Sequence, residues 1–298
     1  MSYDAWIILT GSLVGISCGM IGCFLILRRM AMLADAISHT VLLGIVGAYI
    51  VSNAISGINM LIGALIVGLL TAYFVQLLDS SGVQTDAAIG VVFTSLFAIG
   101  VILISVFADR VHIDAQHALM GEIAFVPWDL ITIFGIEGPR AVYLLGAVLV
   151  IVIILIGLFY KEIKVCSFDP QMAVALGIPI MFIHYLLMGM VSISTVAAFD
   201  AVGAILVVAM LIGPGATAYL LTDRLSVMLL ISAIVGVVSA VAGYYVAVLL
   251  NVSIAGSMAM VVGIIFALVF VFSPTHGLMS KWIGRFQSRK EAGVEQGL

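Results

Sequence analysis

The sequence predicts an all-α polytopic membrane protein with eight or nine transmembrane helices in each protomer. Hydrophobic residues make up 64% of the 298 residues and charged residues only 9%, against about 45–50% and about 25% in an ordinary soluble domain. So few charged groups could not cover the surface of a soluble fold of this size. The 30 glycines agree with this prediction, because helices in lipid associate through close contacts between small residues.

Apolar segments long enough to cross a hydrocarbon core of about 30 Å follow one another along the chain. The nine candidates, with eight as the alternative number, are Trp6–Leu27, Ala36–Val51, Met60–Leu78, Ala87–Phe107, Val142–Tyr160, Ile183–Ala198, Ala201–Leu221, Ser226–Leu250 and Ser257–Phe272. The first is expected to be retained, because the residues before it lack the positive charges of a cleavable secretory signal. The shorter segment Ile123–Ile136 contains Pro127, so we expect it to be re-entrant or interfacial.

Lys and Arg residues near the helix ends predict the orientation of the chain. With nine spans, four basic groups fall on one side, at positions 28–29, 161–164, 224 and 281–290, whereas Arg110 and Arg140 are exceptions in the outer segment 109–140. The N-terminus is therefore expected outside and the C-terminus in the cytoplasm. We expect one transmembrane domain over residues 1–298, with a cytoplasmic loop at 161–179 and a cytoplasmic tail at 273–298.

The loop 161–179 has the pattern of a short amphipathic helix. Asp169 is a suitable N-cap, Pro170 suits the first turn, and Gly177 followed by Pro179 ends the helix. Such a segment is suited to docking a partner protein, although a plain connection between two spans is the alternative.

Asp35 and His39 are the most informative residues of the chain. They lie four residues apart in an apolar segment, so in a helix they share one face. Ser38 lies beside them and is a further candidate for the pathway or its gate. Counted from Arg29 at 1.5 Å per residue, His39 lies roughly 15 Å and Asp35 about 9 Å into the membrane. Ionisable groups at that depth cost at least about 2.5–3.5 kcal/mol and normally face a polar cavity or a partner.

A carboxylate and an imidazole without a thiolate suit a divalent cation such as Mn²⁺, Fe²⁺ or Zn²⁺. The pair therefore predicts a transport site, and the alternative is a hydrogen-bonded pair that holds its helix in register. A zinc-protease helix is excluded, because the catalytic Glu after the first ligand and the second His are missing.

Two further groups of polar residues belong to the predicted outer side. Asp200 is expected either to line the outer opening of a pathway, as a gate, or to cap the seventh span. His112, Asp114, His117 and Glu122 have spacings that could bind a metal weakly, although such groups are more often solvated loop residues.

Several kinds of binding find no support in the sequence. No basic run favours nucleic-acid binding, and three cysteines give no disulfide framework. No G-x-x-x-x-G-K-[ST] motif occurs, so the chain is expected to be non-catalytic and to hold neither a P-loop nucleotide nor a permanent cofactor. ATP would then be bound on a partner subunit.

Three segments together resemble the membrane subunit of the bacterial manganese, zinc and iron ABC importers. They are CFLILRRMAMLADAISHTVLLG at 23–44, KEIKVCSFDPQMAVALGI at 161–178 and VGAILVVAMLIGPGATAYLLT at 202–222, and the ending FSPTHGL fits as well. In the third segment, Gly213 and Gly215 replace larger or alanine residues that are commoner in that family. The resemblance runs through nearly the whole chain.

The resemblance implies a fold similar to the cobalamin- and siderophore-type ABC permeases, with a homodimeric pathway in the bacterial plasma membrane. It implies two cytoplasmic ATPase subunits and an extracytoplasmic metal-binding protein as partners. The family's metal site carries over onto Asp35 and His39. Its role in coupling to the ATPase carries over onto a set in the loop 161–179, namely Phe168, Asp169, Pro170, Ala173 and Gly177.

The sequence and the resemblance together predict an ATP-driven importer of Mn²⁺, with Zn²⁺ or Fe²⁺ next. A proton-coupled secondary carrier or a channel, with Asp35 and His39 as a proton relay, is the main alternative. An assembly or scaffold protein, in which this pair has no role in transport, is a third class.

Overall fold

A computed structural model describes residues 3–52, 57–107, 123–133 and 136–273. Within these ranges, nine helices are long and apolar enough to cross a membrane, so the higher of the two predicted numbers is confirmed. They are α1 (Tyr3–Leu27), α2 (Ala31–Ser52), α3 (Gly57–Ser80), α4 (Thr85–Phe107), α6 (Arg140–Leu158), α9 (Ile180–Val202), α10 (Ala204–Leu221), α11 (Leu225–Leu250) and α12 (Ile254–Phe272).

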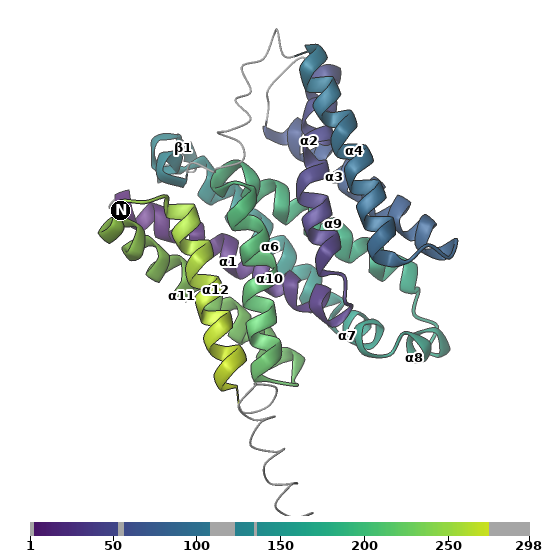
Figure 1. Ribbon diagram of the computed structural model, residues 1–298. Coiled ribbons are helices and arrows are strands. Elements are labelled where there is room, and N and C mark those ends of the chain that lie inside the picture. Colours follow the sequence, from purple (N-terminus) through teal and green to yellow (C-terminus); the bar gives the residue numbers. More distant parts are fainter. Residues whose placement is uncertain (1–2, 53–56, 108–122, 134–135, 274–298) are drawn as a thin grey trace, which may run out of the picture.

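Helix α1 runs obliquely through the middle of the molecule, with α11 and α12 on one side and α2, α3 and α4 on the other (Figure 1). Its approach to α11 is close at Gly15 and Gly236. A Cβ atom added to Gly15 would lie 2.8 Å from backbone atoms of Gly236, and one added to Gly236 would lie 2.6 Å from the backbone of Gly15. The two backbones therefore touch because neither residue has a side chain.

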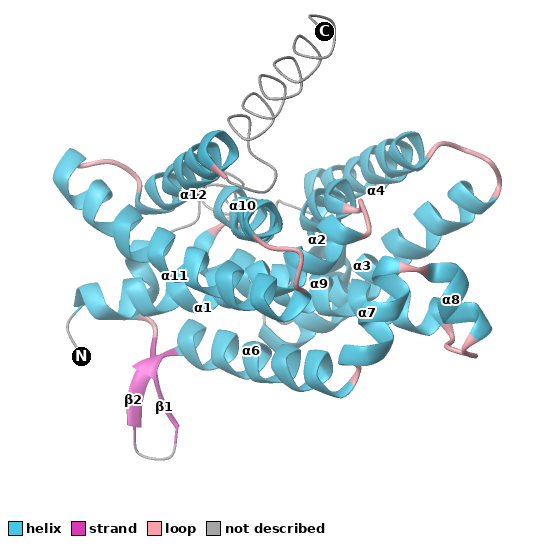
Figure 2. Cartoon of the chain, turned by 90° about the horizontal axis from the view of Figure 1, so that it is seen from below, coloured by secondary structure: helices cyan, strands magenta, loops and turns pink. Residues whose placement is uncertain are grey.

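The segment between α4 and α6 is predicted to be re-entrant or interfacial, and that stays a prediction. Its described part holds a 3₁₀ helix, η2 (Ile123–Trp128), and an antiparallel hairpin of β1 (Leu130–Ile133) and β2 (Ile136–Pro139). Pro127 lies inside η2 and has no N–H to continue an α-helical ladder. The hairpin projects from the helices on the opposite side of the view from α8 (Figure 2).

The boundary between α9 and α10 is also displaced from its predicted place at residues 199–200. Helix α9 continues through Asp200 to Val202, and Gly203, with φ 78°, is the N-cap of α10. With ψ 167°, this backbone conformation is essentially restricted to glycine, so the chain turns there. The prediction that Asp200 caps the seventh span is therefore wrong.

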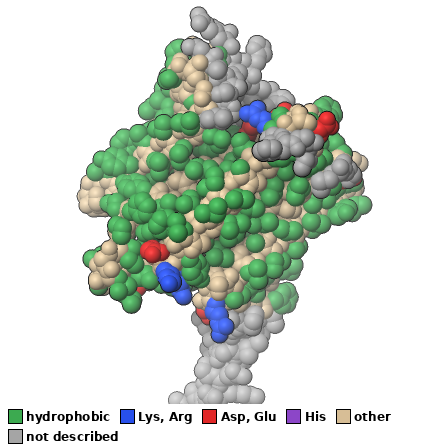
Figure 3. Space-filling view, turned by 180° about the vertical axis from the view of Figure 1, so that it is seen from behind, with side chains coloured by type: hydrophobic (Ala, Val, Ile, Leu, Met, Phe, Trp, Pro, Cys, Tyr) green, Lys and Arg blue, Asp and Glu red, His purple; other side chains and the backbone are tan. Residues whose placement is uncertain are grey.

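The outer surface agrees with a membrane protein. A broad band of hydrophobic side chains crosses the middle of the face in Figure 3, and the charged side chains lie toward its upper and lower margins. Large apolar residues such as Ile102, Ile154 and Leu230 are 59–63% exposed, which suits contact with lipid.

The Gly15–Gly236 contact gives a test of the packing. Gly15→Val is expected to lower stability by about 1–3 kcal/mol, because its side chain would overlap the backbone of α11. Gly146→Ala in α6 is the matched control, since a Cβ atom there meets nothing within 4 Å. Thermal unfolding in detergent measures both, and equal midpoints for the two variants would contradict the proposed contact.

Candidate functional site

A tight turn at residues 28–30 joins α1 to α2. Arg29 has φ 58°, a left-handed conformation that is uncommon for a residue with a side chain. The N–H of Met30 donates to the carbonyl of Leu25 at 2.8 Å, which closes the end of α1. The start of α2 is therefore held directly against the end of α1.

Asp35 and His39 lie on one face of α2, as predicted. Nε2 of His39 is 3.6 Å from Oδ1 of Asp35, beyond hydrogen-bond range but close enough for an ion pair when the imidazole is protonated. The imidazole packs against two rings of α4, with ring centroids 5.4 Å from Phe93 and 6.0 Å from Phe97. The side chains remain 43% exposed at Asp35 and 30% exposed at His39.

Ser38 has a different environment from its two neighbours. It is 2% exposed, and its hydroxyl donates to the backbone carbonyl of Asp35 at 2.6 Å. Its oxygen can still accept a hydrogen bond. A role for Ser38 in a pathway stays a prediction.

The exposure of the pair indicates what it can do. A carboxylate and an imidazole on an apolar span do not face lipid at a tolerable cost, so they face water or another protein. Among the residues that the structure describes, no group of three or more His, Cys, Asp or Glu side chains could hold a metal ion. One protomer thus offers two side-chain ligands here, and a cation that binds there takes its other ligands from elsewhere.

Asp200 is exposed near the end of α9 and lines a cavity of about 220 Å³. Asp129 and Arg140 line the same cavity. The cavity therefore carries charges of both signs and does not attract cations through negative charge alone. The other predicted outer group, His112, Asp114, His117 and Glu122, lies outside the described residues.

The predicted short helix in the loop 161–179 is confirmed as α8 (Pro170–Ala175). Oδ1 of Asp169 accepts the N–H of Met172 at 2.9 Å, so Asp169 is the N-cap. Gly177 has φ 73°, and the N–H of Ile178 donates to the carbonyl of Ala173 at 3.0 Å, which ends the helix. The sequence did not reveal the preceding helix, α7 (Tyr160–Phe168), which is continuous in sequence with a predicted span.

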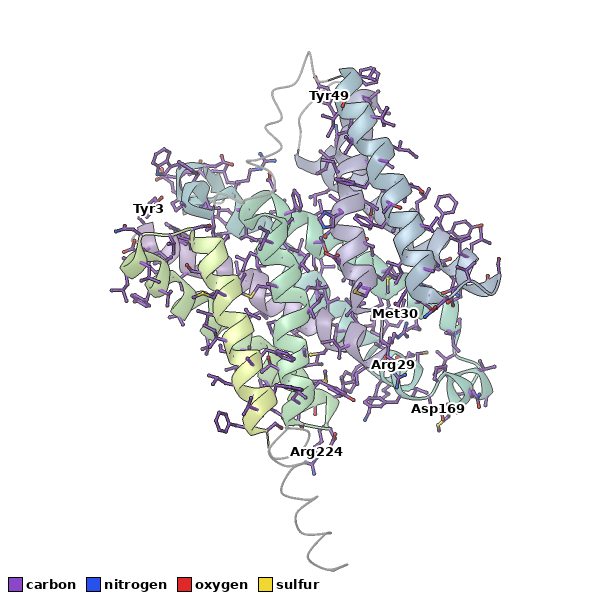
Figure 4. The ribbon with its side chains drawn as sticks, viewed as in Figure 1. Tyr3, Arg29, Met30, Tyr49, Asp169 and Arg224 are labelled. Carbon is purple, nitrogen blue, oxygen red and sulfur yellow. The ribbon has the colours of Figure 1, made fainter. Side chains whose placement is uncertain are left out.

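Helix α8 presents apolar side chains outside the spans. Ala173 is fully buried, whereas four larger residues around it are 53–65% exposed: Phe168, Met172, Val174 and Leu176. In Figure 4, Asp169 lies at the same end of the molecule as Arg29 and Arg224, and Tyr3 and Tyr49 lie at the other end. An exposed apolar patch beyond the membrane band is typical of a protein-binding surface.

Known proteins share this architecture. The model of the ABC 3 transport family matches residues 2–273. The chain is 62% identical over 292 residues to the manganese transport system membrane protein MntD of Bacillus subtilis. The alignment covers 98% of this chain and 99% of MntD. It is 42% identical over 276 residues to the zinc transport system membrane protein TroD of Treponema pallidum, with coverage of 92% and 75%.

A solved structure is similar as well. PsaBC from Streptococcus pneumoniae, in complex with Fab, superposes with a TM-score of 0.77 at 33% identity, over 93% of this chain and 94% of that chain.

The cap of α8 can be tested by hydrogen exchange in the detergent-solubilised protein. Asp169→Ala removes the acceptor of the Met172 N–H and should cost about 1 kcal/mol, which speeds amide exchange within α8 about fivefold. Gln171→Ala, an exposed change inside the same helix, should leave the exchange nearly unchanged. Similar rates in the two variants would contradict the capping role.

Proposed function

The chain belongs to the ABC 3 transport family, and on that premise we propose that it is the permease subunit of an ATP-driven importer of a divalent transition-metal cation. The cation is Mn²⁺ first, with Zn²⁺ or Fe²⁺ next. The chain resides in the bacterial plasma membrane, with its N-terminus outside and its C-terminus in the cytoplasm.

The half-exposed pair on α2 is the observation that carries this proposal. A second copy of the chain would add its own Asp35 and His39, so that two carboxylates and two imidazoles surround one cation. Such a set explains why ionisable groups stay exposed on an otherwise apolar helix. Each pair would hold the partly dehydrated cation briefly as it passes.

The donor atoms and the relatives favour the same cations. Oxygen and nitrogen ligands without thiolate suit Mn²⁺, Fe²⁺ and Zn²⁺, and the three cysteines are buried in the packing. Because Mn²⁺ binds such ligands most weakly of the three, selectivity would depend on the delivering protein or on the geometry of the pathway. The relative with 62% identity is named for manganese transport.

Energy would come from cytoplasmic ATPase subunits that dock on α8 and its exposed apolar residues. Closure of those subunits would push on Phe168, Asp169, Pro170, Ala173 and Gly177 and open the pathway to alternate sides. On the outer side, a metal-binding protein would deliver the cation near Asp200, which would act as an outer gate.

The metal pair is tested by uptake of Mn²⁺ into proteoliposomes that contain the reconstituted complex. Asp35→Ala and His39→Ala should each lower uptake at least about tenfold, since loss of groups that only support metal ligands already costs 10–100-fold in affinity. Asp86→Ala, which removes an exposed carboxylate at the start of α4, should have no effect.

Two results would contradict the proposal. Normal uptake in both variants, with the ATPase subunits still bound, would favour a scaffold role. Uptake that stops when the proton gradient is collapsed but continues without ATP would favour a proton-coupled carrier.

The docking patch is tested by co-purification of the ATPase subunits. Met172→Glu should weaken their binding at least about tenfold, because an unpaired charge would enter an apolar contact. Gln84→Glu adds the same charge in the exposed turn between α3 and α4 and should leave binding unchanged. Unaltered binding and unaltered stimulation of ATP hydrolysis in Met172→Glu would refute docking on this patch.

A further inference from the structure

A cavity with charges of both signs lies where α6 begins and α9 ends. It is the cavity of about 220 Å³ that Asp129, Arg140 and Asp200 line, and the other residues that line it are apolar. Asp200 is the proposed outer gate, whereas Asp129 and Arg140 have no part in the proposed transport. An apolar wall with a few charges of opposite sign favours a ligand that is both amphipathic and zwitterionic.

The hairpin holds two of these charges side by side. Beyond the last pair of residues in β1 and β2, the N–H of Arg140 donates to the carbonyl of Asp129 at 2.9 Å. A Cβ atom added to Gly138 would lie 3.1 Å from the ring of Tyr143, so β2 packs closely on the first turn of α6. The base of the hairpin, which leads directly into α6 (Figure 2), therefore forms one fixed side of the cavity.

The charged side chains of the cavity are open to a ligand. All three are exposed, and among the residues that the structure describes the only ion pair within 4.0 Å joins Asp35 and His39. The guanidinium of Arg140 can thus donate two parallel hydrogen bonds to a phosphate. The two carboxylates can accept hydrogen bonds from an ammonium group. In Figure 3, basic and acidic side chains lie together at the upper margin of the hydrophobic band.

One face of α6 continues from this cavity along the membrane. At 100° per residue, Leu144, Ile151 and Leu158 lie within about 40° of Arg140 around the helix. Ile151 and Leu158 are 45% and 69% exposed. Ile151 lies roughly 16 Å along the axis from Arg140, close to the roughly 15 Å of one leaflet of the hydrocarbon core. An acyl chain that follows this face therefore brings its headgroup to Arg140.

Aromatic side chains of η2 lie beside the same cavity. Phe125 lines it and forms an edge-to-face pair with Trp128, with ring centroids 5.2 Å apart. Trp128 is 72% exposed and Leu130 is 53% exposed. Exposed tryptophan at the end of a span is typical of the interface between a membrane and water. The rings therefore place the cavity at headgroup level, which favours a lipid over a soluble zwitterion.

We propose that this cavity binds the headgroup of phosphatidylethanolamine, with the phosphate at Arg140 and the ammonium group between Asp129 and Asp200. The acyl chains follow the face of α6 that carries Leu144 and Ile151. Phosphatidylglycerol has the phosphate but no ammonium group, so it leaves both carboxylates without a partner. The site adds a lipid ligand to the chain and does not depend on the cation that the chain transports.

The first test measures which phospholipids the full chain retains. The protein is released from bilayers that contain equal amounts of dioleoyl phosphatidylethanolamine and dioleoyl phosphatidylglycerol, and native mass spectrometry counts the lipids that stay bound. Phosphatidylethanolamine should be favoured about fivefold, and Arg140→Met and Asp129→Asn should each remove most of that preference.

Two control variants match these changes. Glu137→Gln removes an exposed carboxylate from the same hairpin, outside the cavity. Arg224→Met removes an exposed arginine at the other end of the molecule. Both should keep the preference for phosphatidylethanolamine.

A second test locates the bound lipid. Phosphatidylethanolamine with a photoreactive diazirine in one acyl chain should label α6 between Leu144 and Ile151, as mapped by peptide mass. Unlabelled phosphatidylethanolamine should suppress this labelling, and phosphatidylglycerol should not. Soluble phosphoethanolamine at the same concentration should compete poorly, because it lacks the acyl chains.

Several outcomes would overturn the proposal. Equal retention of the two lipids by the parent chain, or a preference that survives both Arg140→Met and Asp129→Asn, would exclude the headgroup site. Full competition by soluble phosphoethanolamine would assign the cavity to a soluble ligand. Weaker binding of the metal-binding protein by Arg140→Met, with an unchanged lipid preference, would assign it to protein docking. Because Asp129→Asn is nearly isosteric, it decides the matter even if Arg140→Met does not fold.

Discussion

The close approach of α1 to its neighbours is the constraint on which the rest of the structure depends. In lipid there is no hydrophobic drive that brings one apolar helix to another, so association depends on how closely the backbones can pack. The bare backbones at Gly15 and Gly236 allow α11 to touch α1 along its middle. With α1 enclosed in this way, its end at Leu27 becomes a fixed point from which α2 departs.

The end of α1 at Leu27 sets where α2 begins, and so where Asp35 and His39 lie. The left-handed Arg29 allows α2 to turn back directly from α1, and α4 supplies the rings of Phe93 and Phe97 beside His39. Both side chains of the pair nevertheless stay partly exposed. An apolar helix that exposes a carboxylate and an imidazole needs water or a second protein chain there, and the dimeric pathway proposed above would supply it.

The same end of α1 also contacts the segment that leads into α8. Helix α8 is far from α2 in sequence. The hydrogen bond from Arg28 to Ser167 joins the turn before α2 to α7, the helix that precedes α8.

The sequence by itself determined the places of eight or nine spans, the shared face of Asp35 and His39 and the capped helix after Asp169, because hydrocarbon thickness, the 3.6-residue period and the N-cap bond are local constraints. Only the tertiary structure decided the turn at Gly203, the hairpin after η2 and the exposure of the pair. It alone brought Arg28 to Ser167. The exposure of the pair and the contact of Arg28 with Ser167 depend on which helices touch, and residues far apart in the chain set those contacts, so no local pattern could reveal them.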